Sequence, residues 1–174
     1  MAVRTETPAD HSAITAVVTA AFGRTEEALL VDLIRRSDHF HPDLSLVAEI
    51  DGQIVGHVLF SRIGLDGTGR SMVYSLAPLA VHPDHQRTGI GSALTHEGLR
   101  RLDEIGEPMV VLEGIPAYYP RFGFESASAN GLKCPDPRVP DEAWMVRKLA
   151  AYDPTITGTV VYPPAFYESD AVGP

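Results

Sequence analysis

The sequence has few of the features that mark secreted, disulfide-bonded or membrane-spanning proteins. A single cysteine, Cys134, excludes an internal disulfide and a metal site built on paired cysteines. No apolar run approaches the ~20 residues that cross a bilayer. The first residues also lack the apolar segment of a secretion signal. We therefore expect a cytoplasmic protein with no membrane partner.

Positive charge is also scarce. The 174 residues include 14 Lys and Arg against 23 Asp and Glu, which gives a net charge of −9 with neutral histidines. Because nucleic-acid binding needs a basic face to displace counterions from phosphates, this balance argues against a nucleic-acid partner. It leaves room for a cationic substrate, although an acidic surface most often serves solubility alone.

The apolar periodicity predicts an α+β fold. Helices are expected over about 8–22, 26–36 and 88–105, with a helical turn near 117–121. Strands are expected over about 44–50, 53–60, 71–81, 109–112, from 124 onward, and over 143–149. The Asp51-Gly52 pair predicts a hairpin turn, and a second turn is expected over 66–69. This order predicts a mixed, mostly antiparallel sheet flanked by helices.

The C-terminal part of the chain is rich in proline and irregular in pattern, and we allow it one short strand over 160–162. We divide the chain into a domain over 1–150 and an extension over 151–174. The extension packs on the same domain or on a partner subunit, and the second arrangement would make a homodimer.

One glycine-containing loop carries the chemical signal. Gln86, Gly89 and Gly91 are spaced Q-x-x-G-x-G where a strand ends and a helix begins. Helix N-termini offer unpaired N–H groups and partial positive charge, so this loop predicts an anion site. A dinucleotide fingerprint would need a third glycine where Leu94 stands, and a P-loop would need Gly-Lys, which is absent. Taken alone, the glycines also fit simple strand–helix packing.

The longer segment 76–94, LAPLAVHPDHQRTGIGSAL, resembles the acyl-CoA signature of the GNAT N-acetyltransferase superfamily. The segment 117–124, AYYPRFGF, is similar to the C-terminal signature of that family, in which a tyrosine precedes a Gly-Phe step. The chain also resembles an uncharacterised bacterial branch of this family. That resemblance covers nearly the whole chain and includes residues 158–162 and Phe166. It implies a GNAT-like sheet in which the strand ending near Val81 splays from the strand over 109–112.

The resemblance also implies an acetyl-CoA site. The splayed strand end Leu79-Ala80-Val81 would offer backbone groups to the pantetheine arm. The pyrophosphate would lie on the backbone of Gln86, Arg87, Thr88, Gly89, Ile90, Gly91 and Ser92. Arg87 would either add a direct charge to a phosphate or remain a solvated surface residue.

Two residues are catalytic candidates. By the resemblance, Tyr119 occupies the position of a general acid that protonates the leaving thiolate. Tyr118 competes for this role, but neighbours in a helical turn point about 100° apart, so only one of them should reach the sulfur. Both rings are alternatively packing residues. Glu113, which follows the strand over 109–112, is the candidate base, unless it is a surface residue or proton loss runs through water.

The acceptor site is defined less well. Glu26, Tyr74 and Tyr118 are expected to contact the substrate, and Ser75 is a further cleft candidate. No metal is expected, because His82 and His85 lie in a loop rather than on one helix face. Cys134 has no adjacent histidine, which argues against a nucleophilic role.

We therefore predict an N-acyltransferase that moves an acetyl group from acetyl-CoA directly to a primary amine. The alternative is a non-catalytic module that binds acyl-CoA as a sensor, and a third reading is a transferase of longer acyl groups. Small amines, antibiotics, aminoacyl nucleotides and protein amines all remain open as acceptors.

Overall fold

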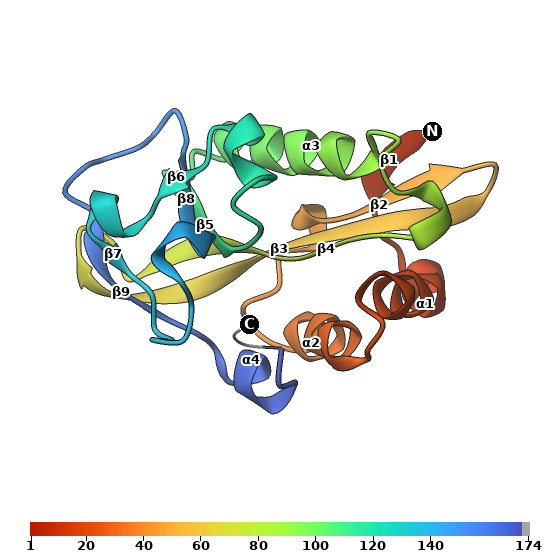
Figure 1. The fold of residues 1–174 in the computed structure, drawn as a ribbon, viewed down its shortest axis with the longest axis horizontal. Coiled ribbons are helices and arrows are strands. Elements are labelled where there is room, and N and C mark those ends of the chain that lie inside the picture. The colour runs from red at the N-terminus through yellow and green to blue at the C-terminus, as the bar shows by residue number, and fades with distance from the viewer. Residues whose placement is uncertain (172–174) are drawn as a thin grey trace.

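One mixed sheet forms the centre of the molecule, and helices cover both of its faces (Figure 1). The computed structural model describes residues 1–171. Helix α3 (Ile90–Glu104) lies on one face, while α1 (His11–Phe22) and α2 (Glu26–Arg35) lie on the other, with the short α4 (Pro164–Glu168) beside α2. The α+β, mostly antiparallel architecture expected from the sequence is confirmed.

The main path of the sheet runs β1-β2-β3-β4-β5-β8-β6. These strands are β1 (Ala2–Thr5), β2 (Ser45–Ile50), β3 (Gln53–Thr68), β4 (Met72–Val81), β5 (Met109–Glu113), β8 (Trp144–Lys148) and β6 (Glu125–Ser126). Only β4 and β5 pair in parallel along this path, and α3 connects them as the crossover helix. Asp51 and Gly52 adopt positive φ in the hairpin turn between β2 and β3, as their sequence predicts.

The predicted turn over 66–69 is wrong for its first three residues. β3 continues to Thr68 because its distal half pairs with β9 (Thr157–Val161), which in turn pairs with β7 (Leu132–Lys133). A glycine is required at position 67 because β3 and β9 approach closely there: a Cβ on Gly67 would lie 1.9 Å from the Thr157 carbonyl oxygen. Strand β9 thereby joins part of the predicted extension to the central sheet. The division of the chain at residue 150 stays a prediction, and residues 172–174 lie outside the described chain.

Two apolar clusters fill the spaces between the sheet and its helices. One joins α1 and α2 to the sheet and also takes in Tyr162 and Phe166 of the C-terminal segment. The other lies under α3 and contains Leu94, Leu112 and Tyr119. Because successive strand residues point to opposite faces, β4 and β5 contribute alternately to both clusters.

A buried ionic group fixes α2 against the sheet. The Glu6 carboxylate accepts hydrogen bonds from Arg35 of α2 at 2.6 Å and from the Ser45 hydroxyl at 2.6 Å, and His57 Nε2 lies 3.3 Å from it. Burial alone would raise the pKa of Glu6, but the hydrogen bonds from His57, Arg35 and Ser45 outweigh it and hold the pKa well below its usual range. The carboxylate is therefore ionised at neutral pH and anchors the helix.

Strands β4 and β5 diverge after a short common stretch. Their parallel pairing covers Tyr74 with Val110 and Ser75 with Val111. β4 then stays with β3 as far as Val81, whereas β5 stays with β8 as far as Glu113. A register shift between β3 and β4 at Ala77 and Pro78 accompanies the divergence. The expected splayed pair is confirmed, and it opens the sheet beyond Ser75.

Candidate functional site

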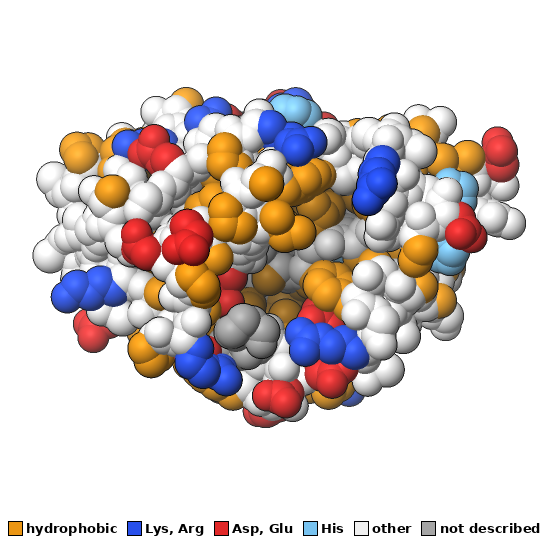
Figure 2. Space-filling model, in the orientation of Figure 1, with side chains coloured by type: hydrophobic (Ala, Val, Ile, Leu, Met, Phe, Trp, Pro, Cys, Tyr) orange, Lys and Arg blue, Asp and Glu red, His pale blue; other side chains and the backbone are white. Residues whose placement is uncertain are grey.

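A cavity of about 970 Å³ occupies the opening between the splayed strands. It appears as the hollow, largely apolar centre of the face in Figure 2. Its walls come from the β4 edge, the start of α3, the α1–α2 junction, the end of β5 and the C-terminal segment. Most of the residues singled out from the sequence lie together in this cavity, although they are spread over three separate parts of the chain.

The loop before α3 leaves a helix N-terminus open to the cavity. Gly89 takes the N-cap position with φ of 91°, and the helix has neither a side-chain cap nor an acidic residue in its first turn. In the described chain, the N–H groups of Ile90, Gly91 and Ser92 donate no backbone hydrogen bond, since the first such bond runs from Ala93 to the Gly89 carbonyl. Three N–H donors and the positive end of the helix dipole therefore meet at one point, which suits an anion.

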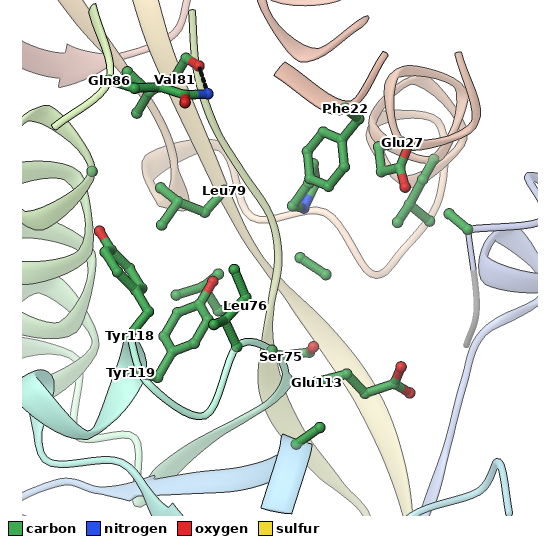
Figure 3. Close-up of a pocket in the computed structure, with 18 of the residues that line it drawn as sticks. Phe22, Glu27, Ser75, Leu76, Leu79, Val81, Gln86, Glu113, Tyr118 and Tyr119 are labelled. Atoms are coloured by element: carbon green, nitrogen blue, oxygen red, sulfur yellow. Dashed lines mark hydrogen bonds between the residues drawn. The ribbon is translucent and has the colours of Figure 1, made fainter. Parts of the chain in front are cut away.

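Side chains of this loop hold its shape. The Gln86 amide donates to the Val81 carbonyl at 3.1 Å, the bond drawn in Figure 3, and the Thr88 hydroxyl donates to the His85 carbonyl at 2.6 Å. Gln86 and Arg87 line the cavity, whereas Thr88 does not. Arg87 forms no ion pair within residues 1–171, so its guanidinium is available to an anion in the cavity.

The free edge of β4 forms the floor beside this loop. Leu79 and Val81 line the cavity, but Ala80 points away and is 1% exposed in the cluster under α1 and α2. The alternation of a strand explains the difference, because the neighbours of an inward side chain face the other side. Ala80 can therefore contribute only its backbone, as the sequence interpretation required.

Tyr119 is held rigidly with its hydroxyl in the cavity (Figure 3). The side chain is mostly buried at 8% exposure, and its ring packs edge-on against Tyr118 and Phe124. Gly114 makes room for it, since a Cβ there would lie 2.3 Å from a carbon of the Tyr119 ring. Burial raises the pKa of Tyr119, so the hydroxyl stays protonated and can donate a proton at neutral pH.

Tyr118 points in a different direction, toward α3. A Cβ on Gly91 would lie 2.7 Å from the Tyr118 hydroxyl oxygen, which places that hydroxyl against the first turn of the helix. The Arg121 guanidinium lies 4.6 Å from the centre of the Tyr118 ring. Tyr118 was expected to contact the substrate, and the structure places it beside the anion-binding end of the cavity.

Glu113 lies on the opposite side of the opening from Tyr119 (Figure 3). Its carboxylate accepts a hydrogen bond from the Tyr162 hydroxyl, and Cys134 Sγ lies 4.0 Å from the same oxygen. The pKa of Tyr162 is raised mainly by burial and further by the negative charge of Glu113. The Tyr162 hydroxyl therefore stays protonated and donates to Glu113. The general-acid and general-base candidates thus face one space from two walls.

Two of the predicted substrate residues do not line the cavity. Tyr74 is buried at 3% under α3, where the Arg62 guanidinium lies 5.9 Å from its ring, and Glu26 faces away from the opening. Their sequence neighbours Ser75 and Glu27 line the cavity instead. A shift of one residue reverses the face of a strand and turns a helical side chain by about 100°.

Sequence reasoning missed several residues of the cavity wall formed by the α1–α2 junction and the C-terminal segment. Phe22 and Arg24 come from the α1–α2 junction, and Tyr162 and Phe166 come from the segment after β9. The aromatic residues of the C-terminal segment were noted as part of the family resemblance, but nothing local in the sequence indicates which surface they pack against. Their place follows from β9, which pairs with β3 and directs the chain back under the cavity.

Comparison with known proteins identifies the family of this chain. The sequence profile described as "Acetyltransferase (GNAT) domain" matches residues 2–127. The chain belongs to the GNAT acetyltransferase family. It is 39% identical to the Escherichia coli K12 N-acetyltransferase YjhQ over 156 residues, covering 87% of this chain and 86% of that protein. It is 38% identical to E. coli YhbS over 151 residues, covering 86% and 88%.

Solved structures agree with the family. The crystal structure of E. coli YhbS in complex with CoA has a TM-score of 0.86 at 37% identity, covering 95% of this chain and 91% of the other. A GNAT acetyltransferase from Brucella melitensis in complex with acetyl-CoA has a TM-score of 0.77 at 33% identity, covering 95% and 97%. The expectation of a GNAT-type acetyltransferase is confirmed.

None of the helices within residues 1–171 is long and apolar enough to cross a membrane. In the same residues, no group of three or more His, Cys, Asp or Glu side chains lies close enough to hold a metal ion.

Proposed function

We propose that this enzyme transfers the acetyl group of acetyl-CoA directly to a primary amine bound in the cavity. One observation carries the proposal: the open N-terminus of α3, the free edge of β4 and the Tyr119 hydroxyl converge on a single cavity. An anion site, a strand edge and a protonated acid are the three elements that a thioester of CoA requires.

The residues present fit acetyl-CoA as donor. The unpaired N–H groups of Ile90, Gly91 and Ser92 suit its pyrophosphate, and Arg87 is placed to add charge. The edge of β4 at Leu79 and Val81 offers backbone groups to the amide-bearing pantetheine arm in the manner of an added strand. The two structural relatives that hold CoA and acetyl-CoA support this assignment.

The proposed reaction uses Glu113 as the general base and Tyr119 as the general acid. The acceptor loses one proton to Glu113, which passes it to solvent, and the neutral amine then forms a C–N bond to the acetyl carbon. The C–S bond breaks, and Tyr119 protonates the departing thiolate. The second amine proton restores the Tyr119 hydroxyl. A backbone N–H near Leu79 or Val81 would polarise the thioester carbonyl, since Pro78 has no N–H to offer.

Direct transfer needs no covalent enzyme intermediate. Cys134 does not line the cavity, and burial raises the pKa of its thiol, which disfavours the nucleophilic thiolate. The positions of Tyr119 and Glu113 on two walls supply acid and base without it. Holding the amine between them would contribute further by keeping the reacting atoms close and aligned.

Release of free thiol from acetyl-CoA across a panel of amines tests the proposal. We expect amine-dependent release from the wild type, and a fall in kcat of about 10²-fold in Glu113→Gln. Cys134→Ser is the matched control, because it alters a neighbour of the same carboxylate without removing the base. Tight CoA binding with no release for any amine would instead establish the sensor alternative.

Other predictions from the sequence keep the status of proposals. They are the phosphate contact of Arg87, a cytoplasmic location and a homodimer. Longer acyl groups are tested by the same thiol-release assay with propionyl-CoA and butyryl-CoA.

A further inference from the structure

The end of the cavity beyond Glu113 has its own composition. Its walls come from the α1–α2 junction, the loop over 139–143 and the segment after β9. Most of its lining side chains are apolar, among them Phe22, Leu30, Ile115, Val139, Ala143 and Phe166, and the polar ones are Arg24, Glu27, Glu113 and Tyr162. This end differs from the α3 end, where the open helix N-terminus, Arg87 and Arg121 supply positive charge.

An aromatic pair forms the back of this wall. The rings of Tyr162 and Phe166 stack with centroids 4.8 Å apart and planes 8° from parallel. Both are nearly buried, at 6% and 5% exposure, and pack into the same cluster as Leu30 of α2. Phe22 lines the same cavity and is 41% exposed, so part of its ring is available to a ligand.

Charge at this end is sparse. Among the described lining residues, two carboxylates face the cavity, those of Glu27 and Glu113. Glu27 is engaged by Arg24 through hydrogen bonds of 2.5 to 3.2 Å. Glu113 accepts the Tyr162 hydroxyl. A polycation would need several carboxylates, and an extended peptide would need further polar partners for its backbone.

We propose that the acceptor is a small primary amine carried on an apolar, ring-sized body. The amine lies near Glu113, and the apolar body fills the space between Phe22 and the Tyr162–Phe166 pair. This inference rests on the proposed function, because it assumes that the space beyond Glu113 receives the acceptor. It makes Phe166, contributed by the short helix α4, a specificity-determining residue.

The test compares four acceptors at fixed acetyl-CoA: 2-phenylethylamine, ethanolamine, spermidine and a lysine-containing peptide. We expect kcat/KM for 2-phenylethylamine to exceed that for ethanolamine by about 30-fold or more, because the phenyl group is removed from water. Highest kcat/KM for spermidine or for the peptide overturns the proposal, and so does a ratio near one between the first two amines.

Variants of α4 locate the effect. Phe166→Ala should lower the ratio of kcat/KM between 2-phenylethylamine and ethanolamine by about 10-fold, because a wall of the subsite is lost. Phe166→Leu, which keeps the core filled, should lower it by a smaller factor. Leu29→Ala is the control, since Leu29 is an apolar residue of the neighbouring helix α2, 46% exposed and outside the cavity lining. An unchanged ratio in both Phe166 variants contradicts the assignment.

Calorimetry separates this proposal from the proposed function. Binding of 2-phenylethylamine and of ethanolamine is titrated into enzyme loaded with CoA, which requires no turnover. If no amine releases thiol but 2-phenylethylamine binds more tightly and Phe166→Ala abolishes the difference, transfer fails and the apolar subsite stands. If thiol is released with no preference for the phenyl group in rate or binding, transfer stands and the subsite proposal fails.

Discussion

The two ends of the cavity are built in different ways. We call the α3 end, where we propose that acetyl-CoA binds, the donor end, and the end beyond Glu113 the acceptor end. The donor end takes its groups mainly from residues 75–92, one stretch of strand, loop and helix, and many of them are backbone N–H groups. The acceptor end takes side chains from α1, α2, the end of β5, the loop over 139–143 and the segment after β9. A family can therefore preserve the first as a local motif while varying the second piece by piece.

The largest expected effect is on the group that stands between the two ends. Tyr119→Phe should lower kcat by about 10²-fold and leave the KM for acetyl-CoA nearly unchanged, because only a transition-state proton donor is lost. Tyr118→Phe is the control and should alter donor affinity more than kcat. Equal kcat in wild type and Tyr119→Phe would remove Tyr119 from the mechanism.

The same residue predicts a pH profile. Tyr119 must be protonated to act, and burial raises its pKa above the ordinary value of about 10. Activity should therefore show no falling limb between about pH 7 and pH 10, since the limb moves upward with the pKa. A fall in kcat centred below about pH 9 that disappears in Tyr119→Phe would contradict this environment.

The next largest effect is expected from a substitution that affects CoA binding at the donor end alone. Gly89→Ala should weaken CoA binding by about 10-fold, because its φ of 91° is strained for any residue with a Cβ. Gly106→Ala is the matched control: its φ is 77°, its Cβ would also meet nothing within 4 Å, and it lies at the far end of α3. The preference among amines should be the same in both variants, and a changed preference would show that the two ends are not independent.

A smaller effect is expected where the ends meet. Gly114→Ala places a methyl group against the Tyr119 ring and should lower kcat by about 5-fold through displacement of the hydroxyl. In the Tyr119→Phe background the same change should have little effect on kcat, because no hydroxyl remains to be displaced. Additive losses in the double variant would assign Gly114 a different role.

The smallest effect on activity is expected at the buried Glu6 carboxylate, which belongs to neither end. Its pKa is lower in the folded than in the unfolded chain, so its contribution to the free energy of unfolding is complete above about pH 4.5 and is lost as pH falls further. In urea titrations, Glu6→Gln should be less stable than wild type at pH 7. The difference should shrink as the pH drops from about 4.5 to 3. A difference independent of pH would argue against this linkage.

The helix start and open loop at the α3 end of the cavity could be predicted because their sequence signal is local. A helix start and an anion site are predicted by three residues within six positions of the chain, Gln86, Gly89 and Gly91. The Asp51-Gly52 turn and the splayed strands followed from short patterns or from the family resemblance in the same way. No interaction with a distant segment was needed to interpret them.

The acceptor end was beyond local patterns. Tyr162 meets Glu113 across 49 positions of sequence, and only the pairing of β9 with β3 brings them together. Tyr74 and Glu26 were each one residue away from the side chains that reach the cavity, Ser75 and Glu27, because periodicity does not fix which side of an opening a strand presents. The Asp66-Gly67 pair suggests a turn, but glycine is also required where two strands approach closely, and the sequence alone does not distinguish these two reasons for a glycine.

The divergence of β4 from β5 has a consequence for solubility. A strand edge with unpaired backbone groups ordinarily invites pairing with another chain and hence aggregation. Here that edge lines the cavity, with α3 on one side and α1 and α2 on the other. The proposed donor would act as the missing strand, so acetyl-CoA should slow hydrogen exchange of the β4 amides. Under this proposal, the free edge pairs with a ligand rather than with another protein chain.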